Sequence, residues 1–327
     1  MKKEIEKLYK DLDKKYDGIL TGKKIPEKRR VETEILSLDI ILGGGIPEKT
    51  AIEYFGKKSS GKTTFALLTI ATFQKQNKVC VFIDGEKAFD EKWATTLGVD
   101  TENLLIVRPE TLEEAGKVLV DLSENNTDLV VIDSIVSIIP ELEDTSDIDE
   151  PKRAAQAKVN ALIVRKIQQI WNRSNTSFIF INQIRDNMSP YGSPIITPGG
   201  RAIEHFYSVQ VEFRAGSLIE KGVKEEKETI GNEINLRTIK NKTYPPHKRS
   251  ALDFYFDGRI DNLKSLVYAC VKESIIELQG SYFKYGKYKE QGIENFRNLI
   301  DENELYKELK NKLFIKLGFI KEVDKQN

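Results

Sequence analysis

The clearest chemistry in the sequence lies in the pattern GxxxxGK[ST], which residues 56–63 match as Gly56, Lys57, Lys58, Ser59, Ser60, Gly61, Lys62 and Thr63. The run AIEYF precedes this stretch and a helix-forming run begins at Thr64, which is the strand, loop and helix setting that the pattern requires. In such a loop the backbone N–H groups surround the phosphates of a nucleotide, the lysine reaches the β and γ oxygens, and the threonine hydroxyl binds Mg²⁺. Residues 56–64 are therefore predicted to bind ATP and Mg²⁺, with Lys62 also serving catalysis.

Two carboxylates follow apolar runs that have the character of buried strands. The run LVVIDS places Asp133 at a strand end, which suits the carboxylate that holds Mg²⁺ through water. The run VCVFID is followed by Gly85 and Glu86, and ATP hydrolysis needs a carboxylate that orients or deprotonates the attacking water. Glu86 is our candidate for that role. Taken alone, a strand-end aspartate can equally cap a helix, and a turn glutamate can simply be solvated.

Composition fits a globular protein with a sizeable core. Of the 327 residues, 39% are hydrophobic and 31% charged, and 51 basic side chains balance 51 acidic ones. A nucleic-acid site must therefore be local rather than a property of the whole surface.

No apolar run is long enough to span a bilayer, and the charged N-terminus lacks a secretory signal, so we expect a cytoplasmic protein. Cys80 and Cys270 lie in apolar runs and are expected to be buried free thiols.

The pattern along the chain predicts an α/β fold with a mostly parallel, mixed sheet and helices on both faces. Strand-like and helical runs alternate through the first part of residues 31–258, and their apolar strand centres indicate burial on both faces. Residues 209–256 instead read as successive antiparallel strands. We expect three parts: an N-terminal helical arm at 1–30, a core at 31–258, and a small α+β domain at 259–327.

These pieces, in this order, resemble the RecA recombinase family over residues 36–318. The matching blocks are SLDIILGGGIP, GKKSSGKTT, FIDGEKAFD, LGVDTENLLIVRPET, VVIDS, SNTSFIFINQIR, TPGG and TIKNKTYPP. The resemblance implies a RecA-like ATPase core and a DNA-dependent ATPase that forms filaments on single-stranded DNA. It further implies exchange of strands with homologous double-stranded DNA in recombination and repair. The phosphate loop alone does not distinguish a recombinase from other ATPases.

The resemblance also implies roles for residues around the nucleotide. Glu86 matches the catalytic glutamate, although Lys87 follows it where many relatives have histidine. Asp90 matches the residue that reads the adenine amino group. Trp93 falls where an aromatic ring stacks on adenine, and core packing is the alternative for this side chain.

Three further catalytic residues follow from the resemblance. Gln183 matches a sensor that touches the γ-phosphate and signals to the adjacent DNA loop, although a strand-end amide can also be merely structural. Lys240 and Lys242, two apart in a predicted strand, match lysines that reach the γ-phosphate of a neighbouring protomer. From sequence alone, such lysines would more often face solvent.

Two segments match the DNA-binding loops of the family, at about 146–153 and 184–198. Basic groups would contact the DNA backbone, and apolar side chains would insert between bases. The candidate DNA-binding residues are Arg153, Lys158, Arg165, Arg185, Met188, Tyr191, Ile195, Ile196, Gly199, Gly200 and Arg201.

An active site completed by a neighbour requires an oligomer, and the resemblance implies a helical filament joined by the N-terminal helix. Single-strand-binding and loader proteins are further expected partners. Two alternatives remain open at this point: a RecA-fold motor ATPase or helicase, and a non-catalytic ATP-binding mediator. The short N-terminal arm argues against the first, and the presence of Glu86, Lys240 and Lys242 argues against the second.

Overall fold

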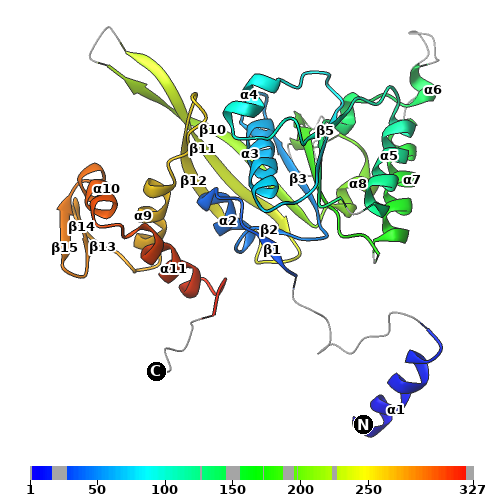
Figure 1. The fold of residues 1–327 in the computed structure, drawn as a ribbon, viewed down its shortest axis with the longest axis horizontal. Helices are drawn as coiled ribbons and strands as arrows, with labels where there is room; N and C mark the ends of the chain where they lie inside the picture. Colours follow the sequence, from blue (N-terminus) through cyan, green and yellow to red (C-terminus); the bar gives the residue numbers. More distant parts are fainter. Residues whose placement is uncertain are drawn as a thin grey trace.

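The computed structural model describes residues 2–16, 28–125, 127–144, 155–171, 173–186, 195–196, 198–222 and 227–321. At its centre lies a mixed eight-stranded sheet (Figure 1) with the order β12-β11-β10-β3-β7-β6-β4-β5. The strands are β3 (Ala51–Gly56), β4 (Cys80–Asp84), β5 (Leu105–Val107), β6 (Leu129–Asp133), β7 (Ser177–Gln183), β10 (Val209–Lys221), β11 (Glu228–Asn241) and β12 (Arg249–Tyr255). Strands β10, β3, β7, β6, β4 and β5 run parallel, whereas β11 and β12 extend the sheet antiparallel.

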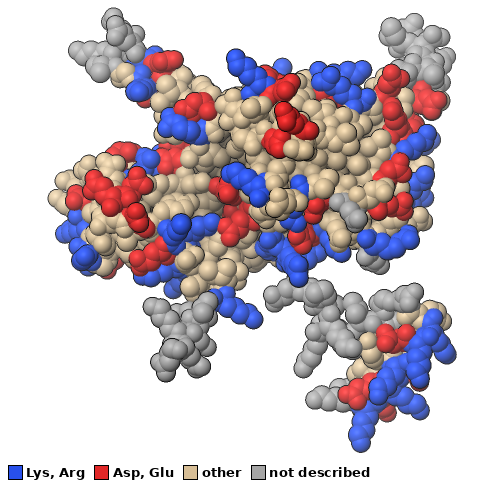
Figure 2. All heavy atoms as spheres, viewed as in Figure 1, with Lys and Arg blue, Asp and Glu red and all other residues tan. Residues whose placement is uncertain are grey.

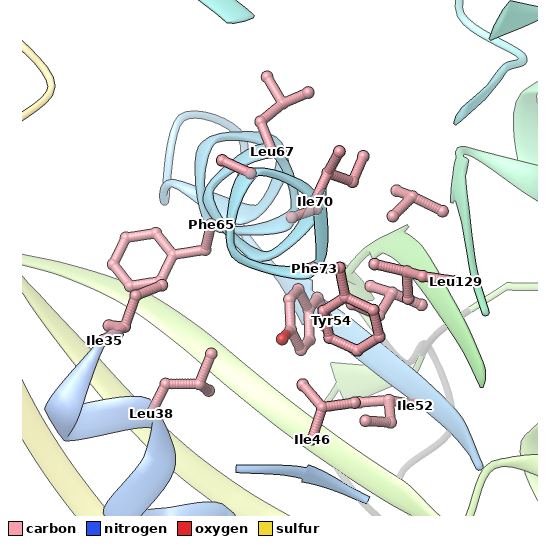
Figure 3. Close-up of a cluster of buried hydrophobic side chains, with 14 of the residues drawn as sticks. Ile35, Leu38, Ile46, Ile52, Tyr54, Phe65, Leu67, Ile70, Phe73 and Leu129 are labelled. Carbon is pink, nitrogen blue, oxygen red and sulfur yellow. The ribbon is translucent and has the colours of Figure 1, made fainter. Parts of the chain in front are cut away.

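Side chains of the strands alternate between two hydrophobic clusters, one on each face of the sheet. Phe82 joins the first cluster, whereas Val81 and Ile83 join the second. Figure 3 shows part of the first cluster, where Phe73 of α3 lies beside Tyr54 of the sheet and Phe65 of α3 points toward Ile35. Helices therefore cover both faces, as the apolar strand centres predicted.

The helices divide between these two faces. The first cluster includes residues of α2 (Leu36–Leu42), α3 (Lys62–Lys75) and α4 (Glu91–Thr96). The second includes residues of α5 (Leu112–Glu124), α7 (Ala155–Ile170) and α8 (Arg201–Phe206). Shorter elements complete this region: β1 (Arg30–Val31), β2 (Ile46–Pro47), η2 (Ile135–Ser137), α6 (Glu141–Asp144), β8 (Arg185–Asp186) and β9 (Ile195–Ile196).

The C-terminal part has a hydrophobic cluster of its own. The elements of this part are α9 (Asn262–Lys272), β13 (Glu277–Gln279), β14 (Tyr282–Tyr285), β15 (Tyr288–Gln291), α10 (Ile293–Glu302) and α11 (Tyr306–Lys316). Leu36 of α2 also belongs to this cluster, so the C-terminal part packs directly on the core. Its helices and small sheet agree with the predicted α+β character of this segment, and its extent as a separate domain stays a prediction.

The N-terminal helix α1 (Lys2–Asp13) lies apart from the main body in Figure 1. Its apolar side chains Ile5 and Leu8 are 55% and 59% exposed. Among the residues that the structure describes, no helix is long and apolar enough to cross a membrane. Cys80 and Cys270 are buried and unpaired, as expected, and burial raises the pKa of both thiols to about 12.

Candidate functional site

The phosphate loop joins the end of β3 to the start of α3, as the sequence predicted. Gly56 pairs with Phe213 of β10, and a Cβ on Gly56 would lie 2.2 Å from the Phe213 carbonyl oxygen, so only glycine fits. Ser59 and Gly61 have φ values of 58° and 92°, which turn the chain back towards the helix. The loop thus leads directly into the N-terminus of a 14-residue helix, whose first backbone N–H groups favour an anion there.

Lys62 is held beneath this loop. Its side chain is buried, and Nζ donates hydrogen bonds to the carbonyl oxygens of Gly56 (3.2 Å) and Lys57 (2.8 Å). Burial lowers the pKa of the Lys62 ammonium, and the negative charges of Asp133 and Glu86 oppose that shift. The lysine therefore lies against the loop that would hold phosphates, next to two acidic groups that share the site.

Thr63 and Asp133 meet across the gap between α3 and β6. The Thr63 hydroxyl donates to Asp133 Oδ2 over 2.5 Å. Burial raises the pKa of the Asp133 carboxyl to about 6, with Glu86 adding to the shift while Thr63 and Lys62 oppose it. Because hydroxyl and carboxylate oxygens suit Mg²⁺, directly or through water, these two residues fit the predicted magnesium site.

Glu86 lies in a turn that the end of β4 holds in place. The buried carboxylate of Asp84 accepts hydrogen bonds from the backbone N–H groups of Ala88 (2.9 Å) and Phe89 (3.2 Å) and from Arg108 Nε (2.9 Å). Gly85 passes so near β6 that a Cβ would lie 2.7 Å from the Ser134 carbonyl oxygen. Asp84 thus fixes the turn, and Glu86 itself is left exposed at the edge of the sheet.

Three side chains converge on the Glu86 carboxylate. Oε1 accepts from Gln183 Nε2 (3.3 Å) and lies within hydrogen-bond distance of Ser134 Oγ (3.4 Å) and Ser137 Oγ (3.3 Å). The two hydroxyls also share a hydrogen bond of 2.6 Å, so one serine donates to the other, which in turn donates to Glu86. The two serines were not identified from the sequence, although hydroxyls three residues apart directly after Asp133 would have been a usable signal. Glu86, the Mg²⁺ candidates and the sensor candidate therefore share one site, at the carboxyl ends of β4, β6 and β7.

Asp90 and Trp93 have local structural partners. Asp90 caps α4, because its carboxylate accepts from the Trp93 backbone N–H (3.0 Å). The Trp93 ring is half-buried and meets Phe254 edge-on, with ring centroids 6.4 Å apart. These contacts match the packing alternative for Trp93, and contact of either side chain with adenine stays a prediction.

Lys240 and Lys242 lie far from the phosphate loop of their own protomer. Lys240 pairs with Gln210, which pairs with Glu53, three residues before Gly56. That register puts Lys240 about 10 Å from Gly56 along the strand direction and about two strand spacings across, beyond the reach of one lysine. The sequence predicted both lysines within one strand. That prediction is wrong for Lys242, which follows the last residue of β11.

The two ammonium groups rest on the C-terminal end of α8. Lys240 Nζ donates to the Glu204 carbonyl oxygen (2.8 Å), and Lys242 Nζ to that of His205 (3.5 Å). Burial lowers the pKa of Lys240, and the nearby charge of Lys242 lowers it further. Neither lysine belongs to the site around Glu86 within a single chain.

The described DNA-binding candidates gather around α7, α8 and the ribbon β8–β9. Lys158 and Arg165 are exposed and two turns apart on α7, and Arg201 is exposed at the start of α8. Gly199 and Gly200 let the chain pass close to α7, since a Cβ on Gly200 would lie 2.9 Å from Ala157 Cβ.

Other candidates are described only in part. Arg185, Ile195 and Ile196 form the ribbon, of which only the backbone is described. Arg153, Met188 and Tyr191 lie outside the described residues. Figure 2 shows acidic and basic side chains intermixed over the visible face, in keeping with a local rather than a global site for nucleic acid.

The glycine-rich cradle, the Thr63–Asp133 pair and Glu86 at the edge of a mixed sheet define a P-loop NTPase with a RecA-like core. A sequence profile of the RecA N-terminal domain matches residues 2–261. The chain belongs to the RecA family, the ATP-dependent DNA recombinases.

Three relatives show how far this likeness extends. The chain is 38% identical to Protein RecA of Sulfurovum sp. over 88% of its own length and 84% of that protein. It is 37% identical to Protein RecA of Wolinella succinogenes, with 98% and 94% covered. Identity to Protein RecA of Thermus aquaticus is 34%, with 95% and 94% covered.

Proposed function

We propose that this chain hydrolyses ATP at the site around Glu86. The presence or absence of bound ATP there controls the affinity of the chain for single-stranded DNA. The observation that carries this proposal is the hydrogen bond between Gln183 and Glu86. Gln183 ends β7, and the chain continues from it into the ribbon β8–β9. A change at Glu86 when ATP binds therefore reaches the first residue before the proposed DNA-binding segment.

In this mechanism the chain positions groups around the γ-phosphate. The loop N–H groups and Lys62 bind the phosphates, while Thr63 and Asp133 would hold Mg²⁺, which would neutralise charge on the phosphate oxygens. Glu86 orients the attacking water or accepts its proton. Ser134 and Ser137 restrict the Glu86 carboxylate to one orientation. We further propose that Asp90 and Trp93 contact the adenine.

Lys240 and Lys242 act on the ATP of a neighbouring protomer. Their register places them at a distance from their own phosphate loop, and two ammonium groups beside a γ-phosphate would stabilise transition-state charge. A head-to-tail contact of this kind that does not close gives a helical filament. The exposed apolar face of α1 supports the same assembly, because it needs a partner surface.

The DNA interface would include Lys158, Arg165 and Arg201, with the β8–β9 ribbon and the two loop segments. Single-stranded DNA would occupy it first and homologous double-stranded DNA would pair there. Single-strand-binding and loader proteins are proposed as further partners, and because the substrates are DNA molecules we place the activity in the cytoplasm.

The test measures ATP hydrolysis with and without single-stranded DNA, together with electron microscopy in a non-hydrolysable ATP analogue. We expect DNA-stimulated hydrolysis and helical filaments on DNA. Rings with unwinding activity would favour a motor ATPase, and ATP binding without hydrolysis would favour a mediator. Either result would overturn the proposed function.

A further inference from the structure

A buried carboxylate lies in the central strand, beneath the groups described above. Glu53 is fully buried in β3, three residues before Gly56. Its Oε1 accepts from Asn182 Nδ2 (2.9 Å) at the end of β7, and its Oε2 accepts from Gln210 Nε2 (2.7 Å) in β10. A charge this deep is costly unless donors satisfy it, so its two amide partners are held firmly in return.

The side chain of Asn182 makes contacts that none of the assigned roles explains. Its Nδ2 donates to Glu53 and also to the Pro198 carbonyl oxygen (3.0 Å), while its Oδ1 accepts from the Gln183 backbone N–H (3.0 Å). Pro198 follows the ribbon β8–β9 and Gln183 precedes it. One amide group therefore bonds to the chain on both sides of the ribbon.

Only one orientation of the amide satisfies all three partners. Glu53 Oε1 and the Pro198 carbonyl oxygen can only accept, whereas the Gln183 N–H can only donate. Aspartate at position 182 would keep the bond from Gln183 and place an oxygen against two acceptors. The requirement for both a donor and an acceptor is thus specific to the amide.

We propose that Asn182 is a positioning residue that ties Gln183 to the far end of the ribbon β8–β9, with Glu53 as its buried anchor. A displacement of Gln183 at the Glu86 site then moves the Asn182 amide, and the Pro198 carbonyl with it. Both ends of the ribbon shift together rather than the near end alone. This inference rests on the proposed function, since it specifies how the nucleotide site reaches the DNA-binding segment.

The experiment compares full-length wild type with three variants: Asn182→Asp, Glu53→Gln, and the double variant carrying both changes. The clamp is the set of bonds by which the Asn182 side chain joins Gln183 to Pro198. In Glu53→Gln the new amide oxygen accepts from Asn182, and Gln210 can rotate its own amide to match, so the clamp is retained. In the double variant the new amide at position 53 donates to the new carboxylate at position 182. That bond restores the link between the strands, but the Pro198 carbonyl still lacks its donor. The double variant therefore separates the clamp from the packing of the core.

The readout is the ratio of affinities for a fluorescent thymidine oligonucleotide with and without a non-hydrolysable ATP analogue. We expect a ratio of at least ~10 for wild type and for Glu53→Gln, and a ratio near one for the double variant. The melting temperature of the double variant and its affinity for a fluorescent nucleotide should stay close to wild type. Asn182→Asp should also lose the ratio, and if it does not fold, the double variant still decides the question.

A double variant with the wild-type ratio would overturn the clamp. So would a double variant that loses stability and nucleotide affinity along with the ratio, because that pattern indicates a merely structural role. If wild type itself shows no increase in affinity with the ATP analogue, the proposed function fails and the clamp falls with it.

Discussion

The Gln183 amide donates to the Glu86 carboxylate over 3.3 Å, so the last residue of β7 touches the proposed catalytic group beyond β4. Those strands are separated in the sheet by β6, which carries the Mg²⁺ candidate Asp133. A γ-phosphate bound beside Asp133 would compete for the same amide, since an amide N–H can donate to phosphate as well as to carboxylate. The pair is thus arranged to report whether ATP is present.

Replacement of Gln183 by alanine tests that arrangement. Without the amide, Glu86 keeps its hydrogen bond from the serine pair, but the nucleotide site loses its contact with β7. We expect stimulation of hydrolysis by single-stranded DNA to fall at least ~10-fold, with a much smaller change in nucleotide affinity. Steady-state ATPase titrations with DNA measure the effect. Full stimulation in Gln183→Ala would show that the signal takes another route.

Ser134 and Ser137 should matter for the rate of hydrolysis rather than for binding. The two hydroxyls bond to each other and together orient Glu86, and a hydrogen bond of this kind contributes about 1 kcal/mol, or roughly fivefold in rate. We expect Ser134→Ala and Ser137→Ala each to lower kcat by a few-fold and to leave KM for ATP nearly unchanged. A double variant with normal kcat would show that neither serine contributes to hydrolysis.

Mixing two inactive variants tests whether Lys240 and Lys242 act across an interface. Glu86→Gln lacks its own catalytic carboxylate but carries both lysines, whereas Lys240→Ala/Lys242→Ala has the carboxylate and lacks the lysines. Random mixing in equal amounts should restore about a quarter of wild-type hydrolysis, the fraction of interfaces that combine both intact parts. An absence of recovery in co-assembled filaments would argue that the lysines do not serve a neighbour.

Asp39 in α2 should make stability depend on pH. Its fully buried carboxyl accepts from the Thr33 backbone N–H (2.9 Å) and Oγ1 (2.8 Å). Burial raises the pKa of Asp39 to about 7, against the opposing hydrogen bonds from Thr33. Because the folded pKa exceeds the unfolded one, its stabilising contribution is complete below about pH 4 and is lost as pH rises through about 7.

The corresponding measurement compares urea unfolding of wild type and Asp39→Asn between pH 5 and pH 8. Asparagine mimics the neutral acid, so wild type should lose stability relative to the variant by up to about 1.4 kcal/mol per pH unit. A difference that does not vary with pH would show that Asp39 does not titrate in this range.

The sequence was sufficient for those features that depend on local pattern. Alternating strand-like and helical runs and the GxxxxGK[ST] setting predicted β3, the loop and α3, and apolar runs predicted strands that end at Asp84, at Asp133 and near Gln183. It did not predict the short α2, whose residues divide between two clusters on either side. Such a helix has no single apolar stripe, so its periodicity gives little signal.

The missed contacts around the site depend on strand order and register. The spacing of Ser134 and Ser137 after Asp133 marks two hydroxyls near the site, but it does not show that they face Glu86. Nothing local indicates that Asn182 meets Glu53 from a distant part of the chain. A charged residue inside the apolar run AIEYF was a signal that a buried polar partner was needed. The partner itself became identifiable only once β3 and β7 were seen to be neighbours.

Strand exchange between a single-stranded circle and a homologous linear duplex, followed on agarose gels, tests the central claim most directly. We predict exchanged product with ATP and Mg²⁺, none with heterologous duplex, and none with Lys62→Ala. Wild-type protein that hydrolyses ATP on single-stranded DNA but yields no joint molecules or exchanged product under these conditions would contradict the account.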